Sequence, residues 1–147
     1  MSGKYPDLLR RRAESMMRLA ERLLSEGEYD LAVLNAEYAA RLYVKSVLLR
    51  LTGEEWKGHG IRTLLGAVAL AAQGGGLRDV AEEIVDFTRR NRRMLAELEE
   101  AHTRSVYGPF EYSEEQARAI LGLAKSIIEL MKGIEERVFG GGHGDGR

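Results

Sequence analysis

Apolar residues recur at helical spacing in five blocks of this chain, and sustained strand-like alternation is absent throughout. A helix brings residues three and four positions apart onto one face, whereas a strand alternates faces at every residue. The blocks run over about 5–25, 30–51, 61–72, 77–101 and 113–138. The sequence therefore predicts an all-α fold.

Turn and capping residues separate these blocks. Gly27 and Gly53 follow the first two blocks, and three consecutive glycines at 74–76 follow the third. Ser113 and Gln116 have the spacing of a capping box, which predicts the start of the last helix. Because most connections are short, sequential helices should pack antiparallel. We expect an up-and-down bundle of four long helices plus one short helix, the block at 61–72.

The chain has the length of one domain. With 147 residues it can bury a sizeable core. The block at 30–51 is apolar over most of its circumference, so we expect it to be the central helix. Residues 140–147 are mostly glycine and cannot pack. The expected organisation is a helical bundle over 1–139 and a flexible tail over 140–147.

Composition argues against several classes of protein. Without cysteine, the chain has no disulfide framework and no cysteine-ligated zinc. The three histidines, at 59, 102 and 143, lack metal-ligand spacing, and no phosphate-loop or dinucleotide fingerprint is present, so no metal or cofactor is expected. The polar first residues and the lack of a long apolar run predict no signal peptide and no membrane span, hence a cytoplasmic protein. At a net charge of −1, binding of nucleic acid would need a local basic patch.

Several short motifs occur in an order and spacing that resemble one known family. They are GEYDLA at 27–32, the alanine pair at 39–40, Lys45, GHGIRTLL at 58–65 and RSVYGP at 104–109. Over about residues 8–138 the chain resembles the HEPN family of small helical domains. The resemblance implies a four- or five-helix bundle that commonly forms homodimers and often works beside a small nucleotidyltransferase. Some members are RNA-cleaving toxins of toxin–antitoxin pairs, and others have no demonstrated activity.

The resemblance also implies where an RNA-cleaving site would lie. Active members carry an arginine followed, after four to six residues, by a histidine. His102 lies in the expected neighbourhood, but the nearest arginine before it, Arg93, is separated from it by eight residues. Arg137 and His143 have the required spacing, but the histidine falls in the glycine-rich tail, which cannot hold a fixed geometry. The favoured hypothesis is therefore a dimeric, nucleotide- or RNA-associated module that partners a small nucleotidyltransferase, without a clear catalytic motif.

Two alternatives remain open at the level of sequence. The first is a metal-independent RNA endonuclease in which His102 acts as general acid or base, and Arg90, Arg93 or Arg104 stabilises the charge on phosphorus. Two copies facing each other across a dimer would then complete a site that one copy lacks. The second is a purely structural bundle that docks another protein. The catalytic candidates are His102, Arg93 and Arg104.

The ligand-binding candidates are Arg90, Asn91, Tyr107 and His59. Asn91 and His102 both fall on the apolar stripe of the block at 77–101, where a polar side chain needs a partner or a purpose. Asn91 either lines a cleft or bonds a neighbouring helix. His59 precedes a helix start that can receive an anion, or else it packs beside Trp56.

The remaining basic and aromatic candidates also have two interpretations each. Arg89, Arg92 and Arg93 form a cluster that either grips phosphate or makes a solvated face on which Glu97 pairs with Arg93. Tyr107 lies in a connection that can carry function, or else it closes the end of the bundle together with the aromatic residues that follow it, Phe110 and Tyr112.

Overall fold

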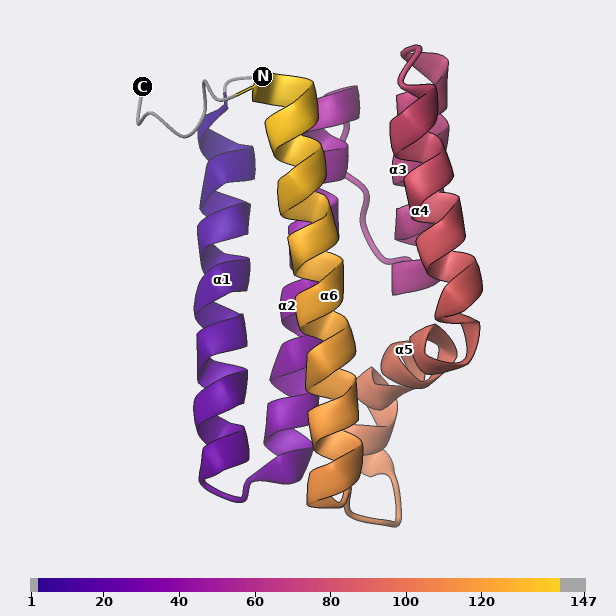
Figure 1. Ribbon diagram of the computed structural model, residues 1–147. Helices are drawn as coiled ribbons and strands as arrows, with labels where there is room; N and C mark the ends of the chain where they lie inside the picture. The colour runs from indigo at the N-terminus through magenta and orange to yellow at the C-terminus, as the bar shows by residue number, and fades with distance from the viewer. Residues whose placement is uncertain (1–2, 141–147) are drawn as a thin grey trace.

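The computed structural model describes residues 3–140, and within that range it contains six α-helices and no strand. The all-α prediction is confirmed (Figure 1). Residues 141–147 of the predicted tail lie outside the described residues. The helices are α1 (Lys4–Ser25), α2 (Tyr29–Thr52), α3 (Ile61–Gly74), α4 (Arg78–Arg90), α5 (Arg92–Tyr107) and α6 (Glu114–Phe139).

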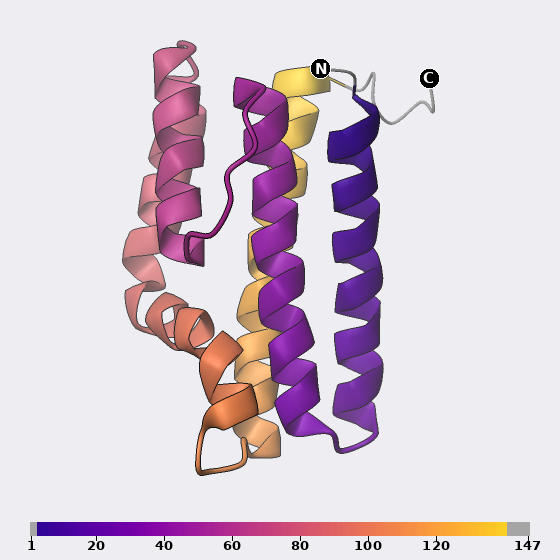
Figure 2. The same cartoon turned by 180° about the vertical axis from the view of Figure 1, so that it is seen from behind.

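Helix α2 is the centre of the fold. It packs against α1, α3, α5 and α6, and half of its residues are buried, which is why the sequence of this helix is apolar almost all round. Figures 1 and 2 place α1 at one edge of the molecule and the α3–α4 pair at the opposite edge, with α2 and α6 between them. The expectation of a central helix in this block is thus met.

The block at 77–101 is two helices rather than the one we expected. Asn91 leaves the helical conformation (φ −114°, ψ 25°), and its side-chain Nδ2 donates to the carbonyl oxygen of Phe87 at 2.9 Å. A short amide side chain offers the backbone an alternative to the next helical hydrogen bond, so the chain ends α4 and restarts as α5 in a new direction. Figure 2 shows the resulting elbow. Asn91 therefore caps α4, and its side chain bonds its own helix and not a neighbouring one.

Helix α6 begins as the sequence indicates. The Ser113 hydroxyl accepts from the backbone N–H of Gln116 at 3.1 Å, and the Gln116 side chain accepts from the backbone N–H of Ser113 at 2.9 Å. These reciprocal bonds satisfy two donors that the first turn would otherwise leave unbonded. The capping-box prediction is confirmed. No helix within residues 3–140 is both long enough and apolar enough to cross a bilayer.

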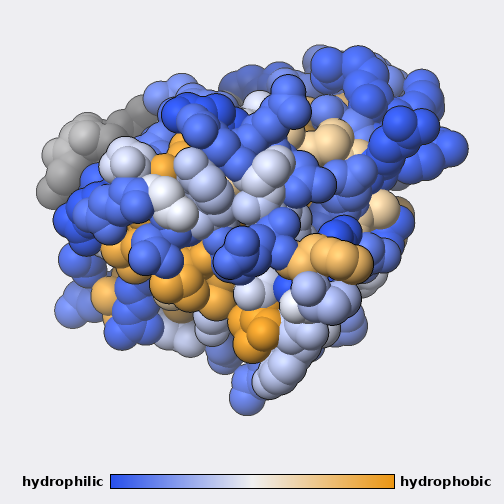
Figure 3. Space-filling view, turned by 90° about the horizontal axis from the view of Figure 1, so that it is seen from below, coloured by the Kyte–Doolittle hydropathy of each residue, from blue (hydrophilic) through white to orange (hydrophobic). Residues whose placement is uncertain are grey.

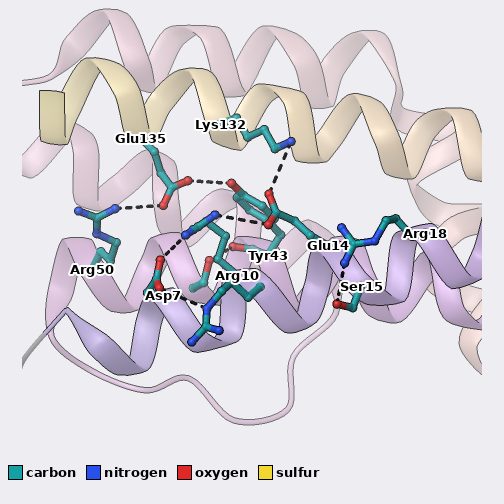
Figure 4. A network of polar contacts seen from close by, with 11 residues as sticks. Asp7, Arg10, Glu14, Ser15, Arg18, Tyr43, Arg50, Lys132 and Glu135 are labelled. Carbon is teal, nitrogen blue, oxygen red and sulfur yellow. Dashed lines mark hydrogen bonds and ion pairs between the residues drawn. The ribbon is translucent and has the colours of Figure 1, made fainter. Parts of the chain in front are cut away.

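A polar network joins α1, α2 and α6 on a different side of α2 from the site described below (Figure 4). The Glu135 carboxylate is only 2% exposed; it accepts from the Tyr43 hydroxyl at 2.8 Å and from Arg50 at 3.2 Å. Burial, together with the neighbouring Glu135 charge, raises the pKa of Tyr43. Nearby, Glu14 on α1 contacts Lys132 on α6 at 3.6 Å. These bonds fix the three long helices against one another.

Candidate functional site

A buried carboxylate lies between α2 and α5. Glu37 is 2% exposed, and it is one of the few polar residues among the buried, mostly apolar residues of α2. Arg41, one turn further along α2, donates from Nε to Oε2 at 2.8 Å and from Nη2 to Oε1 at 3.2 Å. This forked, two-bond geometry is the strong form of an arginine–carboxylate pair. These two hydrogen bonds offset the free energy that is lost when the carboxylate is removed from water.

His102 reaches the same carboxylate from α5. Its Nδ1 lies 3.2 Å from Glu37 Oε1 and 3.4 Å from Arg41 Nη2, while half of its side chain remains exposed. Nδ1 has two possible roles here: the unprotonated nitrogen accepts a hydrogen bond from Arg41 Nη2, whereas the protonated nitrogen faces the Glu37 carboxylate as an ion-pair partner. In either state the buried glutamate–arginine pair holds the histidine ring at Nδ1.

An accessible aromatic ring completes this group. The Tyr38 ring meets the His102 ring edge-on, with centroids 6.5 Å apart and an interplanar angle of 83°. The guanidinium carbon of Arg41 lies 4.9 Å from the Tyr38 ring centroid, within range of a cation–π contact. Tyr38 is 44% exposed. We call Glu37, Tyr38, Arg41 and His102 the Glu37 cluster.

The Glu37 cluster combines the groups that acid–base chemistry on an anionic substrate needs. Nε2 of His102 can take up or deliver a proton, and Glu37 stabilises the imidazolium that forms. Arg41 uses Nε and Nη2 for Glu37, and its Nη1 makes no hydrogen bond within residues 3–140. Those remaining N–H groups are positioned to stabilise negative charge beside the histidine. The described residues contain no gathering of three or more potential metal ligands.

Sequence reasoning identified His102 but missed its three neighbours. The arginine was sought on the same helix as the histidine, whereas the structure supplies Arg41 from α2, 61 positions away in the chain. The available signal was Glu37 and Arg41 themselves, an ion pair at i,i+4 inside the otherwise apolar block at 30–51. Charged residues are unusual on the central helix of a bundle, so this pair indicates a structural or functional role.

The other arginine and tyrosine candidates lie outside the Glu37 cluster. Arg90 and Arg93 are exposed on either side of the α4–α5 elbow, and neither is paired within the part of the chain that the structure describes. The Arg104 guanidinium carbon lies 5.5 Å from the ring centroid of Tyr112. Tyr112 is buried and closes the end of the bundle, whereas Tyr107 is 82% exposed. Phe110 is likewise exposed, at 76%, so of the three aromatic residues expected to close the bundle only Tyr112 is buried.

The helix start beside His59 already receives an anion from the protein itself. Glu99 accepts from the backbone N–H of Arg62 at 3.2 Å and from its guanidinium Nε at 3.0 Å, and these hydrogen bonds lower the pKa of Glu99. A Cβ at Gly60 would lie 2.5 Å from the Glu99 carboxyl carbon, so a larger residue there would push the Glu99 side chain away from its present position. His59 packs against Trp56, with ring centroids 5.2 Å apart.

The fold and the site together define a class: a small α-helical domain that holds an accessible histidine on a buried glutamate–arginine pair. Comparison with known families identifies which one, because the model of the HEPN domain matches residues 7–134. The chain belongs to the HEPN family, as the sequence motifs indicated. Comparison with curated proteins and with solved structures gave no significant match.

Proposed function

We propose that this protein is an RNA endonuclease that acts without a metal, with the Glu37 cluster as its catalytic site. The observation that supports this function is the buried Glu37–Arg41 pair, both members of which approach Nδ1 of His102, Glu37 Oε1 at 3.2 Å and Arg41 Nη2 at 3.4 Å. A histidine that only filled a helix end would not need a buried ion pair to hold its ring. The pairing of an oriented base with a cation suits cleavage of a phosphodiester.

The proposed reaction uses the 2′-hydroxyl that distinguishes RNA from DNA. Nε2 of His102 removes the 2′-hydroxyl proton, and the oxygen attacks the adjacent phosphorus. The bond from phosphorus to the 5′-oxygen breaks, and that oxygen takes a proton from the imidazolium. The products are a 2′,3′-cyclic phosphate and a 5′-hydroxyl. Free N–H groups of Arg41 stabilise the charge that builds on the phosphorane oxygens.

We further propose that the working unit is a homodimer, which the family resemblance implies and the surface around the Glu37 cluster supports. Leu31 and Tyr38 lie seven residues apart on α2, and both are exposed. Val106, also exposed, lies one turn beyond His102 on α5. Figure 3 views this end of the molecule and shows apolar side chains among hydrophilic ones. A second copy packed here would exclude water from both clusters, and light scattering of purified protein would reveal a dimer.

A second candidate function is the binding of a small nucleotidyltransferase. The observation that favours it is a pair of exposed rings, Tyr107 at the last position of α5 and Phe110 just after it, which are 82% and 76% exposed. Exposed aromatic residues are enriched in protein interfaces. Substituting both with serine should abolish association with such a partner without reducing RNA cleavage, since neither ring contacts the Glu37 cluster.

An RNA-cleavage assay tests the endonuclease. His102→Ala should lower the rate by about 10²–10⁴-fold, the usual contribution of general acid–base catalysis. Glu37→Gln should also lower it strongly, because the neutral amide no longer stabilises the imidazolium. Glu135→Gln is the matched control: Glu135 is buried to the same 2% and also bonded to an arginine, but no histidine contacts it. If His102→Ala cleaves RNA as fast as the wild type, the proposal is wrong.

A further inference from the structure

A groove separates α3 from α4 and α5, with a cavity volume of about 430 Å³. Its floor is apolar and includes Ala69, Ile84 and Leu95. Three arginines line it: Arg62 from the start of α3, Arg89 near the end of α4 and Arg92 at the start of α5. The groove is therefore cationic where the elbow between α4 and α5 meets the first turn of α3.

The arginines at the elbow are largely without acidic partners. Arg92 has none within the described residues, and Arg89 has only a surface contact with Asp86 at 3.5 Å, a kind of pair worth little in water. The predicted pairing of Glu97 with Arg93 is not formed among the described residues. Four of the five residues from 89 to 93 are arginines in a chain whose net charge is −1. Such a local excess of charge attracts a polyanion.

Helix stability explains only part of this charge, because Arg89 and Arg90 lie in the last turn of α4, where cations complement the helix dipole. Arg92 and Arg93 lie in the first turn of α5, which contains no acidic residue. The positive end of the helix dipole lies there, so cations in this turn oppose the dipole. The sequence thus places two cations at a position where they lower the stability of the helix, which favours a role for them outside it.

Helix α5 leads from the groove, which its first residue Arg92 lines, to His102 of the Glu37 cluster near its other end. Arg92, Glu99 and His102 are spaced seven and then three residues apart, which places them on one side of the helix. Arg62, from the groove, bonds Glu99 in the middle of this line. Ten residues separate Arg92 from His102, a distance of about 15 Å along the helix axis at about 1.5 Å per residue.

From this arrangement we infer that the groove binds the phosphate backbone of a single-stranded RNA whose cleaved bond lies at His102. The inference rests on the proposed endonuclease function. A distance of about 15 Å corresponds to about four phosphates of a stacked strand at about 3.4 Å each. None of the described residues that line the groove is aromatic. Without rings on which bases stack, the groove holds the strand through its charge and accepts any sequence.

The experiment measures the salt dependence of RNA binding. We would use fluorescence anisotropy of labelled oligouridylate and oligocytidylate in the uncleaving His102→Ala background, with and without Arg89→Gln and Arg92→Gln together. Each phosphate contact contributes about 0.7 to the slope of log affinity against log salt for a single strand, so losing two should lower the slope by about 1.4. The loss should be equal for both RNAs. Unfolding curves should show that the exposed substitutions leave the fold intact.

The matched control is Arg11→Gln with Arg18→Gln, which removes the same charge from exposed arginines on α1, at the opposite edge of the molecule (Figures 1 and 2). An unchanged slope in the groove variant, or an equal drop in the control, overturns the inference. Displacement of RNA by polyglutamate as effectively as by unlabelled RNA would also overturn it, because the groove would then be a site for an acidic protein.

The two proposals can fail separately. With the wild-type His102 present, the groove variant should raise KM for RNA cleavage and leave kcat near its wild-type value, since the groove does not contact the reacting atoms. If the slope falls as expected but His102→Ala does not affect cleavage, the groove binds RNA, and the assignment of the cleavage site to His102 fails. If His102→Ala abolishes cleavage and the slope is unchanged, the catalytic site stands and the RNA does not use the groove.

Discussion

Removing the Arg41 guanidinium should destabilise this protein more than its partly exposed position suggests. Arg41→Met keeps the aliphatic packing but removes the two hydrogen bonds that Arg41 donates to Glu37, which is 2% exposed. Breaking a buried ion pair by deleting one partner costs about 3–5 kcal/mol. We expect the lower end, about 3 kcal/mol, because His102 Nδ1 remains 3.2 Å from the carboxylate and Arg41 retains 17% exposure.

Urea unfolding at neutral pH measures this cost, and thermal unfolding provides a second reading. For a domain of this size about 3 kcal/mol corresponds to a fall in Tm of about 6–12 °C. The decisive comparison is the double variant Glu37→Leu with Arg41→Met, which removes the buried charge as well. Replacing a buried pair by apolar residues is often neutral, so the double variant should recover to within about 1 kcal/mol of the wild type.

Two results would refute this reasoning. Arg41→Met could cost no more than Arg11→Met, a substitution of an exposed arginine on α1. Alternatively, the double variant could be as unstable as Arg41→Met alone. If the double variant is instead stable but does not cleave RNA, the buried ion pair serves the function of the protein and not its stability.

Three further predictions concern the stability of the helical bundle that holds the site. Tyr43→Phe should cost about 1.5–3 kcal/mol in urea unfolding, because it removes a buried hydrogen bond to the charged Glu135 carboxylate. Ser113→Ala should cost about 1 kcal/mol by the same measurement, as for other lost N-caps, and an unchanged midpoint would contradict the capping box. The third prediction concerns pH: hydrogen bonds from Arg62 lower the pKa of Glu99 below its ordinary value of 4.5. Since the folded-state value lies below the unfolded one, this contribution is fully present above pH 4.5 and is lost as the pH falls through the folded-state pKa. Wild type should therefore lose more stability than Arg62→Gln on acidification over that window, and parallel curves would contradict the pairing.

The helices were predictable because their apolar periodicity is local. The break at Asn91 was not predictable, since the apolar stripe continues across it: Phe87 lies before the break and Leu95 after it, and both are buried. What ends α4 is the hydrogen bond from the Asn91 side chain to Phe87, a local choice that periodicity does not report. One asparagine thus gives α5 the direction in which His102 reaches Glu37.

The site was predictable only in part because its members come from two helices. Spacing along the chain identified His102 as a catalytic candidate, but it did not identify Arg41 as its partner. Which residues of α2 and α5 face each other depends on the packing of the whole bundle. The arginines at the elbow show the opposite case. Their sequence cluster was visible, but the expected pairing of Arg93 with Glu97 depended on side-chain geometry and was not found among the described residues.

The contrast between Glu37 and Glu135 shows what distinguishes a site from a structural ion pair in this bundle. Both carboxylates are 2% exposed, and both accept from an arginine. The third bond differs. Glu135 bonds the buried Tyr43 hydroxyl, whose pKa is raised, so that proton stays in place at physiological pH. Glu37 instead lies 3.2 Å from Nδ1 of His102, whose side chain is half exposed. Burial therefore anchors both carboxylates, and the Glu37 cluster differs in presenting a half-exposed histidine, which the proposed proton transfer requires.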